Sequence, residues 1–171
     1  MEKIKTYRIG ISRTFPEKHP RAGEETSFSG KIQCGLCNSN CEFCSRVHPA
    51  YRNKKLHTIR ANYPLWKKRI DDVNAGKAVL VLFEWTGKPY RSKQRELFRF
   101  DKDSGIGVQK LLNSGGVWLL GKPDSDKWNK VIGINELSRN DGLSEQDFRD
   151  WFKDYDLSEP FAIIHFTKFR Y

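Results

Sequence analysis

Lys55-Leu56-His57-Thr58-Ile59-Arg60 is the segment from which the rest of this chain is best interpreted, because it places an amine, a hydroxyl and a guanidinium on one extended run. It lies in the most basic region, since residues 46–70 contain eight Lys or Arg and no Asp or Glu. Such a concentration of positive charge is typical of proteins that meet phosphates. A solvated basic face beside core aromatics is the alternative interpretation.

The composition indicates one soluble globular domain. The chain has 171 residues, a formal net charge of +10, 37% hydrophobic residues and 13% aromatic residues. This length suits a single domain that folds without staples, and the aromatic rings must supply much of the core volume. We find no apolar run as long as a membrane span and no apolar signal core after Met1. We therefore expect a cytoplasmic protein that does not interact with membranes.

Four cysteines crowd into eleven residues and form two CxxC pairs. They are Cys34, Cys37, Cys41 and Cys44. In a reducing compartment such pairs hold a metal more often than they form disulfides. We expect structural tetrahedral zinc, with His19, His48 or His57 as possible replacements for one sulfur. Unligated thiols or two local disulfides are the alternatives.

The stretch from Cys37 to Cys44 also matches CxxxCxxC, and so resembles the cluster loop of radical SAM enzymes. That family builds its chemistry on a partial (β/α) barrel, which requires repeated strand and helix units after the cysteines. The downstream sequence has one long helical pattern followed by a run of strand patterns. We therefore do not expect an iron-sulfur cluster.

The first half of the chain alternates between strand and loop patterns. Residues 6–12 alternate as a half-buried strand, 14–25 read as a loop, and 26–33 as a short helix. After the cysteines, the basic strand leads into a helix with Pro64 near its start and Gly76 at its end. Its apolar stripe comprises Leu65, Trp66, Ile70 and Val73.

The second half reads mainly as strands. We expect strands over residues 78–85, 90–100, 117–120, 131–137 and 160–166, and a capped helix that begins at Ser144. These elements predict an α+β fold, a small, partly open β-barrel of five to six strands flanked by two to three helices. The whole chain, 1–171, is one domain, and residues 30–53 are a cysteine-containing insertion.

The order of these elements resembles the ASCH domain, a family of PUA-like barrels. Residues 55–60 are similar to the Lys-x-x-Thr-Ile-Arg strand of small bacterial ASCH enzymes that deacetylate acetylcytidine, and the resemblance extends over residues 54–166. Asn53 stands where the family usually has Gly. The resemblance implies a PUA-like barrel and an amidohydrolase.

Residue by residue, the resemblance implies that Lys55, Thr58 and Glu96 are catalytic and that Arg60 clamps the ligand. Thr58 would attack or position water, Lys55 would act as base, and Glu96 would orient Lys55 or contact the base. Lys55 and Thr58 have opposite parity on a regular strand, so the strand must begin at His57 or contain a bulge. Alternatively, Thr58 is an ordinary strand residue and Glu96 pairs with Arg60 or Arg95.

We favour a non-catalytic binding module over the enzyme. A basic barrel cleft would hold RNA, DNA or a modified nucleoside through phosphate contacts and base stacking. The exposed hairpin 85–94 combines aromatics with cations, although a hairpin without a ligand is the simpler interpretation. The expected ligand-binding residues are Arg60, Tyr63, Trp85, Lys88, Tyr90, Arg91 and Lys93, with Lys54, Lys55 and Lys67 on the same rim.

Overall fold

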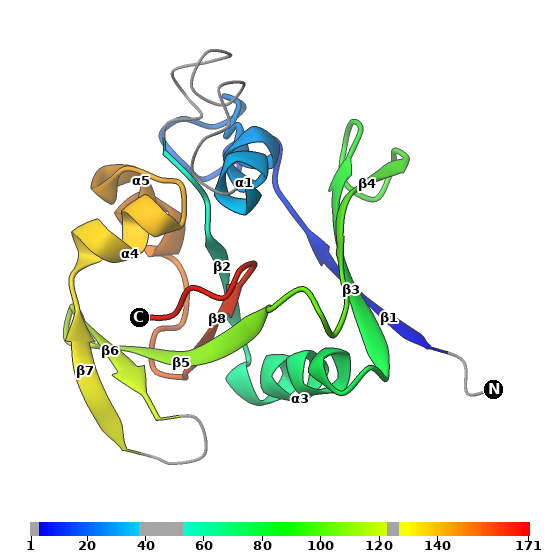
Figure 1. The fold of residues 1–171 in the computed structure, drawn as a ribbon. Coiled ribbons are helices and arrows are strands. Elements are labelled where there is room, and N and C mark those ends of the chain that lie inside the picture. Colours follow the sequence, from blue (N-terminus) through cyan, green and yellow to red (C-terminus); the bar gives the residue numbers. More distant parts are fainter. Residues whose placement is uncertain (1–3, 38–52, 123–126) are drawn as a thin grey trace.

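The computed structural model describes residues 4–37, 53–122 and 127–171. These residues form eight strands and four helices, so the predicted α+β class is confirmed, whereas the expected numbers of strands and helices were too low (Figure 1). The strands are β1 (Lys5–Gly10), β2 (His57–Ala61), β3 (Ala78–Trp85), β4 (Gln94–Phe100), β5 (Gly107–Ser114), β6 (Val117–Gly121), β7 (Trp128–Ile132) and β8 (Phe161–His165). The helices are α1 (Phe28–Leu36), α3 (Tyr63–Asn74), α4 (Ile134–Asn140) and α5 (Glu145–Phe152).

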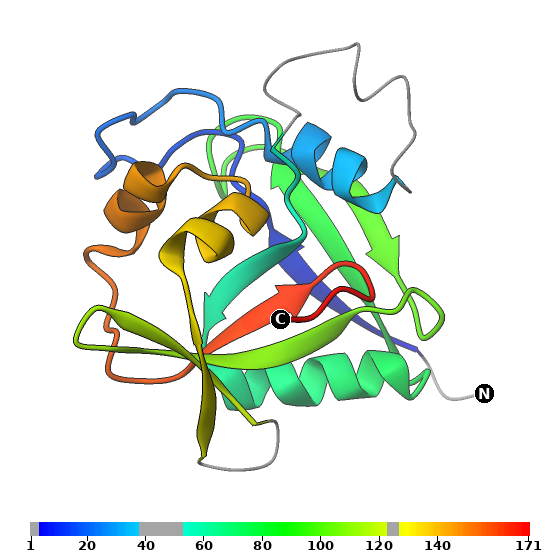
Figure 2. The same cartoon turned by 60° about the vertical axis from the view of Figure 1, so that its left-hand side comes forward.

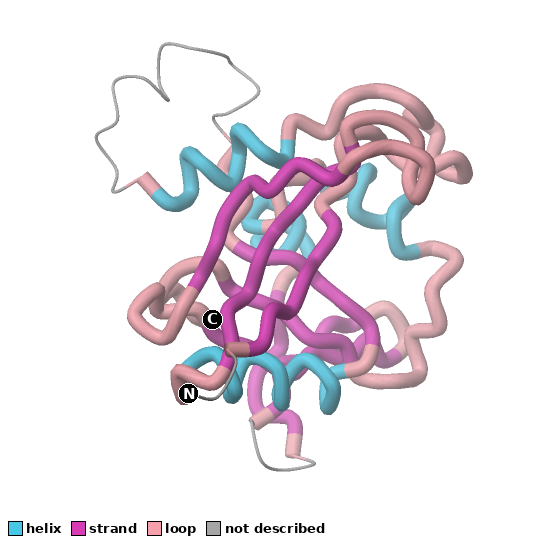
Figure 3. Tube along the Cα trace, turned by 90° about the vertical axis from the view of Figure 1, so that its right-hand side faces the viewer, coloured by secondary structure: helices cyan, strands magenta, loops and turns pink. Residues whose placement is uncertain are grey.

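The strands form two sheets around one hydrophobic core. One sheet has the order β1-β3-β4 and the other β2-β8-β5-β6-β7. Only β1 and β3 pair in parallel among the named strands. Figure 3 shows the strands of the smaller sheet side by side with α3 below them. Every residue of β8 is buried, and this strand lies between β2 and β5.

β3 confirms the prediction made from its apolar run, because it is the middle strand of its sheet and Leu80, Val81 and Leu82 are fully buried. Its partner β4 begins at Gln94 rather than at residue 90. A tight connection replaces the first part of the expected strand: Thr86 N donates to Lys93 O, and Tyr90 has a positive φ of 63°.

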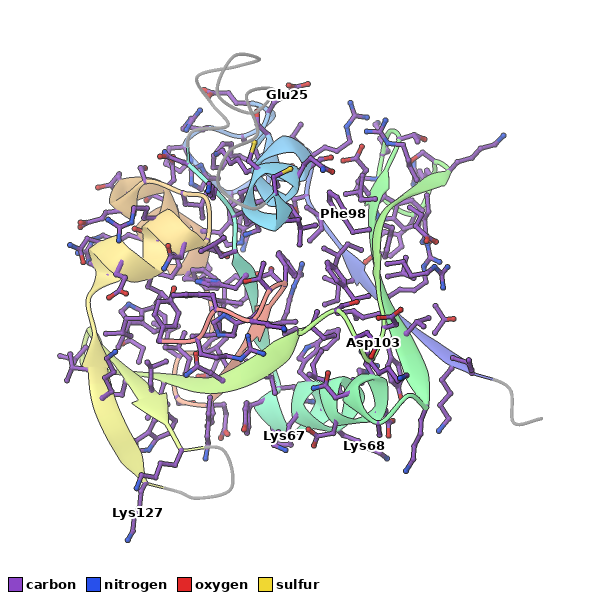
Figure 4. The ribbon with its side chains drawn as sticks, viewed as in Figure 1. Glu25, Lys67, Lys68, Phe98, Asp103 and Lys127 are labelled. Atoms are coloured by element: carbon purple, nitrogen blue, oxygen red, sulfur yellow. The ribbon has the colours of Figure 1, made fainter. Side chains whose placement is uncertain are left out.

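A bulge in the β3–β4 ladder changes which way Glu96 faces. Leu82 pairs with Phe98, but the next residue of β3, Phe83, pairs with Glu96. Leu97 is the extra residue, so Glu96 turns to the face opposite that of Phe98 and Phe100. Figure 4 labels Phe98 on β4. In a regular strand Glu96, Phe98 and Phe100 would share one face, and the bulge prevents this.

Two parts of the second half differ from the prediction. β5 was missed, although it pairs with both β8 and β6. Residues 131–137 were expected to form one strand, but β7 ends at Ile132 and α4 begins at Ile134, with Gly133 as its N-cap in extended conformation. Leu137 is fully buried from this helix. A short apolar run is compatible with both the helical and the strand period of buried residues, which explains the error.

The predicted helix starts are confirmed by their caps. The Asn62 side chain accepts a hydrogen bond from Leu65 N at 3.2 Å at the start of α3, where Pro64 occupies the first turn. Ser144 Oγ accepts one from Asp147 N at 3.1 Å at the start of α5. No helix in the described ranges is long and apolar enough to cross a membrane.

α1 begins and ends later than predicted and includes the first part of the expected insertion 30–53. It runs to Leu36, so Cys34 and Gly35 are helical and Cys37 is the C-cap. A Cβ at Gly35 would lie 2.8 Å from the carbonyl oxygen of Lys55. Gly35 is therefore required by the close approach of α1 to the segment before β2. Cys41, Cys44 and His48 lie outside the described residues.

Candidate functional site

A cavity of about 390 Å³ lies where α1, β2, the segment 11–19 and the end of α5 meet. We call it the Lys55 pocket. Its polar lining includes Lys55, Thr58, Arg60 and Asp141. Its apolar walls include Ile11, Phe28, Ile59, Trp151 and Phe152, and its remaining lining residues are Ser12, Pro16, Glu17, Lys18, His19, Asp150, Asp154 and Tyr155. A largely apolar cleft with a few convergent polar groups is typical of a ligand site.

The Lys55 ammonium is held on the inner side of this pocket. Its side chain is only 2% exposed, and Nζ donates at 2.7 Å both to Asp141 Oδ1 and to the main-chain oxygen of Asp141. Nζ also lies 4.2 Å from the centroid of the Phe28 ring. Burial lowers the pKa of Lys55, while Asp141 opposes that shift. Burial likewise favours protonated Asp141, but Lys55 and His57 outweigh it and hold the pKa of Asp141 below its usual range.

The start of β2 brings Lys55 and Thr58 to the same pocket despite their odd separation. The strand begins at His57, and Lys55 forms an isolated antiparallel bridge with Asp141 before it. The break in regular pairing removes the parity restriction of a continuous strand. Thr58 is 5% exposed and lines the pocket.

Arg60 carries a positive charge without an acidic partner among the described residues. Its Nη2 donates to Gly10 O at 2.6 Å, and its Nε is buried without a hydrogen bond. Burial lowers the pKa of Arg60, but an arginine remains charged in proteins. Asp141 attracts this charge but makes no ion pair with it in the described part of the chain. A buried guanidinium at the boundary of a cavity favours an anionic or strongly polar ligand there.

A second cavity, of about 830 Å³, adjoins the first, and we call it the aromatic groove. The two cavities share Ile11, Ser12, Pro16, Glu17 and Arg60 in their linings. The groove continues along Phe83, Trp85, Gly87, Pro89, Tyr90 and Gln94, and its other wall is Gly10 and residues 13–15. Tyr90 is 89% exposed, with its ring centroid 5.3 Å from that of Trp85.

Glu96 does not join Lys55 and Thr58, so this part of the expected catalytic set was wrong. It is exposed, lines neither of these cavities, and pairs with Arg99 at 3.0 Å. The bulge in β4 turns it away. Asp141 is the carboxylate that contacts Lys55 instead, and sequence reasoning missed it because the two residues are 86 positions apart.

The expected ligand-binding residues divide into three groups. Arg60 lines both cavities, and Trp85 and Tyr90 line the groove. Lys88, Arg91 and Lys93 lie exposed in the connection after β3. Tyr63 is 6% exposed at the start of α3 and lines neither of these two cavities.

The basic region does not form one continuous rim. Lys55 and Arg60 line the Lys55 pocket, while Lys67 and Lys68 belong to α3. Figure 4 shows both of these lysines at α3, well away from the β3–β4 hairpin. The positive charge of residues 53–70 is therefore divided between different faces, because α3 turns the chain away after β2.

Of the expected metal ligands, only Cys34 and Cys37 are described. Cys34 is buried, Cys37 is partly buried, and neither is in a disulfide. No group of three or more metal-ligating side chains occurs within the ranges described above. Two of the alternative ligands have other partners: His19 Nε2 is 3.2 Å from Asp147 O, and His57 Nε2 is 2.6 Å from Tyr171 Oη.

Comparisons with protein-family models, curated proteins and solved structures found no match to this chain.

Proposed function

We propose that this chain binds nucleic acid or a modified nucleoside. One base of the ligand would lie in the Lys55 pocket, and the neighbouring nucleotides would lie in the aromatic groove. The observation that carries this proposal is the continuity of the two cavities at Arg60, a cation without an acidic partner among the described residues. The backbone of a bound nucleic acid would pass the Arg60 guanidinium on its way from the pocket to the groove.

The chemistry of each cavity suits a different part of such a ligand. In the pocket, Thr58 offers a donor and acceptor to a base edge, and Phe28 and Trp151 offer apolar walls to its faces. In the groove, Trp85 and Tyr90 offer stacking surfaces that tolerate any base. Arg13 lines the same groove and supplies a second positive charge for the phosphates.

We further infer that the domain is an ASCH-like one and that its two sheets make a partly open PUA-like barrel. In support, the strand with the Lys-x-x-Thr-Ile-Arg pattern pairs along its whole length with the closing strand β8.

The binding proposal is tested by fluorescence anisotropy with fluorescein-labelled single-stranded RNA and DNA of about eight nucleotides. We expect affinity to fall steeply between about 50 and 200 mM salt, since phosphate contacts release counterions. Tyr90→Ser should cost about 1–3 kcal/mol of binding free energy, the usual effect of losing one stacked base. Arg60→Gln should weaken binding and flatten the salt dependence.

Matched controls separate the groove from general positive charge. Arg91→Gln removes an exposed cation beside the groove, and Lys130→Gln removes an exposed cation from β7, on the opposite side of the ribbon in Figure 1. We expect only Arg91→Gln to weaken binding. Equal effects of the two variants, or full affinity in Tyr90→Ser, would contradict the proposal.

A second candidate function is amide hydrolysis of an acetylated nucleoside, favoured by the presence of Lys55 and Thr58 in one pocket. Burial lowers the pKa of Lys55, which brings its free-base form closer to neutral pH. We propose that Asp141, rather than Glu96, orients that amine. Hydrolysis of N4-acetylcytidine should then be lost in Thr58→Val and retained in Thr6→Val, which changes an exposed threonine of β1. Absence of hydrolysis by the wild-type chain removes this candidate and leaves the binding proposal standing.

We also propose that the cysteines hold zinc. Cys34 lies in the last turn of α1 and Cys37 is its C-cap, and this CxxC spacing suits two thiolate ligands of one metal ion. Metal analysis of the purified protein tests this. We expect about one zinc per chain and its loss in Cys37→Ser.

A further inference from the structure

Behind the Lys55 pocket, a line of hydrogen-bonding groups runs to the last residue of the sequence. Tyr171 Oη lies 2.6 Å from His57 Nε2 and accepts a hydrogen bond from Asn140 Nδ2 at 3.1 Å. On the other side of the imidazole, His57 Nδ1 is 3.4 Å from Asp141 Oδ1, the oxygen that accepts from Lys55 Nζ at 2.7 Å. His57 Nδ1 makes no hydrogen bond within the described residues. Tyr171 and His57 are therefore joined by a hydrogen bond, His57 and Asp141 by an electrostatic contact, and the set ends at the pocket.

One arrangement of donors and acceptors suits both sides of the His57 ring, because the Asp141 carboxylate near Nδ1 favours a hydrogen there. Since Asn140 donates to Tyr171 Oη, the phenol hydrogen is free to go to His57 Nε2. A neutral imidazole that accepts at Nε2 carries its hydrogen on Nδ1, and that hydrogen faces the Asp141 carboxylate. The phenol therefore selects the tautomer that attracts Asp141, whereas the other tautomer would direct a lone pair at the carboxylate.

The surroundings keep this imidazole neutral and fixed. His57 is fully buried, and burial lowers its pKa. His165, its cross-strand partner on β8, is also fully buried, with its ring centroid 5.6 Å away. The tail that carries Tyr171 folds back beside β5, where Tyr171 N donates to Gln109 Oε1 at 2.9 Å (Figure 2). Tyr171 is thus held by its main chain as well as by its hydroxyl.

We propose that Tyr171 and His57 are positioning residues that act through Asp141 to hold the Lys55 ammonium in place for the pocket's ligand. This inference rests on the proposed function of the Lys55 pocket. Asp141 takes two of the three N–H groups of Lys55, one at its carboxylate and one at its main-chain oxygen. Fixing the carboxylate therefore fixes the direction of the third N–H, the one available to a ligand or to the Phe28 ring.

The test combines a spectroscopic readout on the free protein with ligand affinity. Long-range ¹H–¹⁵N spectra of the full-length chain distinguish the two imidazole tautomers, and the His57 signals are identified by their loss in His57→Asn. We expect the Nδ1–H tautomer in the wild type and a population of the Nε2–H tautomer in Tyr171→Phe. We also expect Tyr171→Phe to weaken binding of the labelled single-stranded RNA about two- to tenfold, the usual effect of one hydrogen bond.

Two further variants separate positioning from general stability. His57→Asn keeps an amide donor near the place of Nδ1, and we expect it to retain affinity within about twofold, whereas His57→Gln places its donor near Nε2 and should lose about two- to tenfold. Tyr7→Phe is the control, because its hydroxyl also makes a 2.6 Å hydrogen bond, to Asp72, away from the pocket. It should leave affinity unchanged.

The outcomes distinguish failure of this inference from failure of the proposed function. If no RNA binds, the proposed function is wrong. Comparing the His57 tautomer in the wild type and in Tyr171→Phe still tests whether Tyr171 controls the imidazole. If His57 in the wild type is the Nε2–H tautomer, or if Tyr171→Phe leaves the tautomer unchanged, the inference is overturned whatever the binding result.

Discussion

Asp141→Asn is the substitution for which the structure gives the largest expected effect. It keeps the size of the side chain but removes the negative charge 2.7 Å from Lys55 Nζ, where the two side chains are only 6% and 2% exposed. At an effective dielectric constant of about 20, the attraction across this distance is about 6 kcal/mol. Desolvation offsets part of it, and breaking one side of such a pair usually costs about 3–5 kcal/mol of unfolding free energy.

The cost of Asp141→Asn should also depend on pH. Burial already lowers the pKa of Lys55, and Asp141 opposes that shift, so the pKa falls further without the carboxylate. Lys55 thus has a lower pKa in the folded variant than in the folded wild type. At pH values between these two pKa values, the folded variant binds fewer protons than the folded wild type. Its stability therefore rises relative to the wild type as the pH increases. We expect the deficit to be largest near neutral pH and smaller under alkaline conditions.

Urea unfolding followed by tryptophan fluorescence measures this cost. Glu96→Gln is the matched control, since it makes the same chemical change in an exposed ion pair, with Arg99 at 3.0 Å. Exposed ion pairs contribute about 0–1 kcal/mol to the free energy of unfolding. Equal losses of stability in Asp141→Asn and Glu96→Gln would refute the claim that the Lys55 pair is buried and interdependent.

Three further changes test the local structure. Gly35→Ala should lower the unfolding free energy by about 1–3 kcal/mol, because its Cβ would lie 2.8 Å from Lys55 O. This cost should outweigh the better helix propensity of alanine. A variant that is more stable in urea unfolding would contradict the close approach of α1 to Lys55 O. Ser144→Ala should cost about 1 kcal/mol through loss of the cap on Asp147 N, and Ser144→Thr should restore most of it. Burial lowers the pKa of Lys31 to about 8, so the wild type should gain stability as the pH rises from about 8 towards 10.5, and Lys31→Met should show a smaller gain in pH-dependent unfolding.

Elements with strong local signals could be predicted from the sequence. The apolar run of β3, the Asn62 and Pro64 start of α3 and the Ser144 cap of α5 each depend on a few neighbouring residues. The same was true of the closing strand β8. These signals sufficed for the α+β class and for placing Thr58 and Arg60 on one strand, with Lys55 just before it.

The features that complete the site are set by tertiary pairing. Asp141 reaches Lys55 across 86 positions, and the bulge that turns Glu96 away depends on how β3 and β4 pair. β5 escaped prediction because its residues do not alternate cleanly between buried and exposed positions. Residues 134–137 were predicted as the end of a strand because a short apolar run does not distinguish the helical from the strand period.

Photochemical cross-linking of single-stranded RNA to the intact chain, with the modified peptides identified by mass spectrometry, tests the central claim most directly. If the strand lies in the aromatic groove and enters the Lys55 pocket, the cross-links should fall on Trp85 and Tyr90 and on the segment around Trp151. Cross-links confined to α3, where Lys67 and Lys68 lie, would contradict the account, and the aromatic groove would then not be the binding surface.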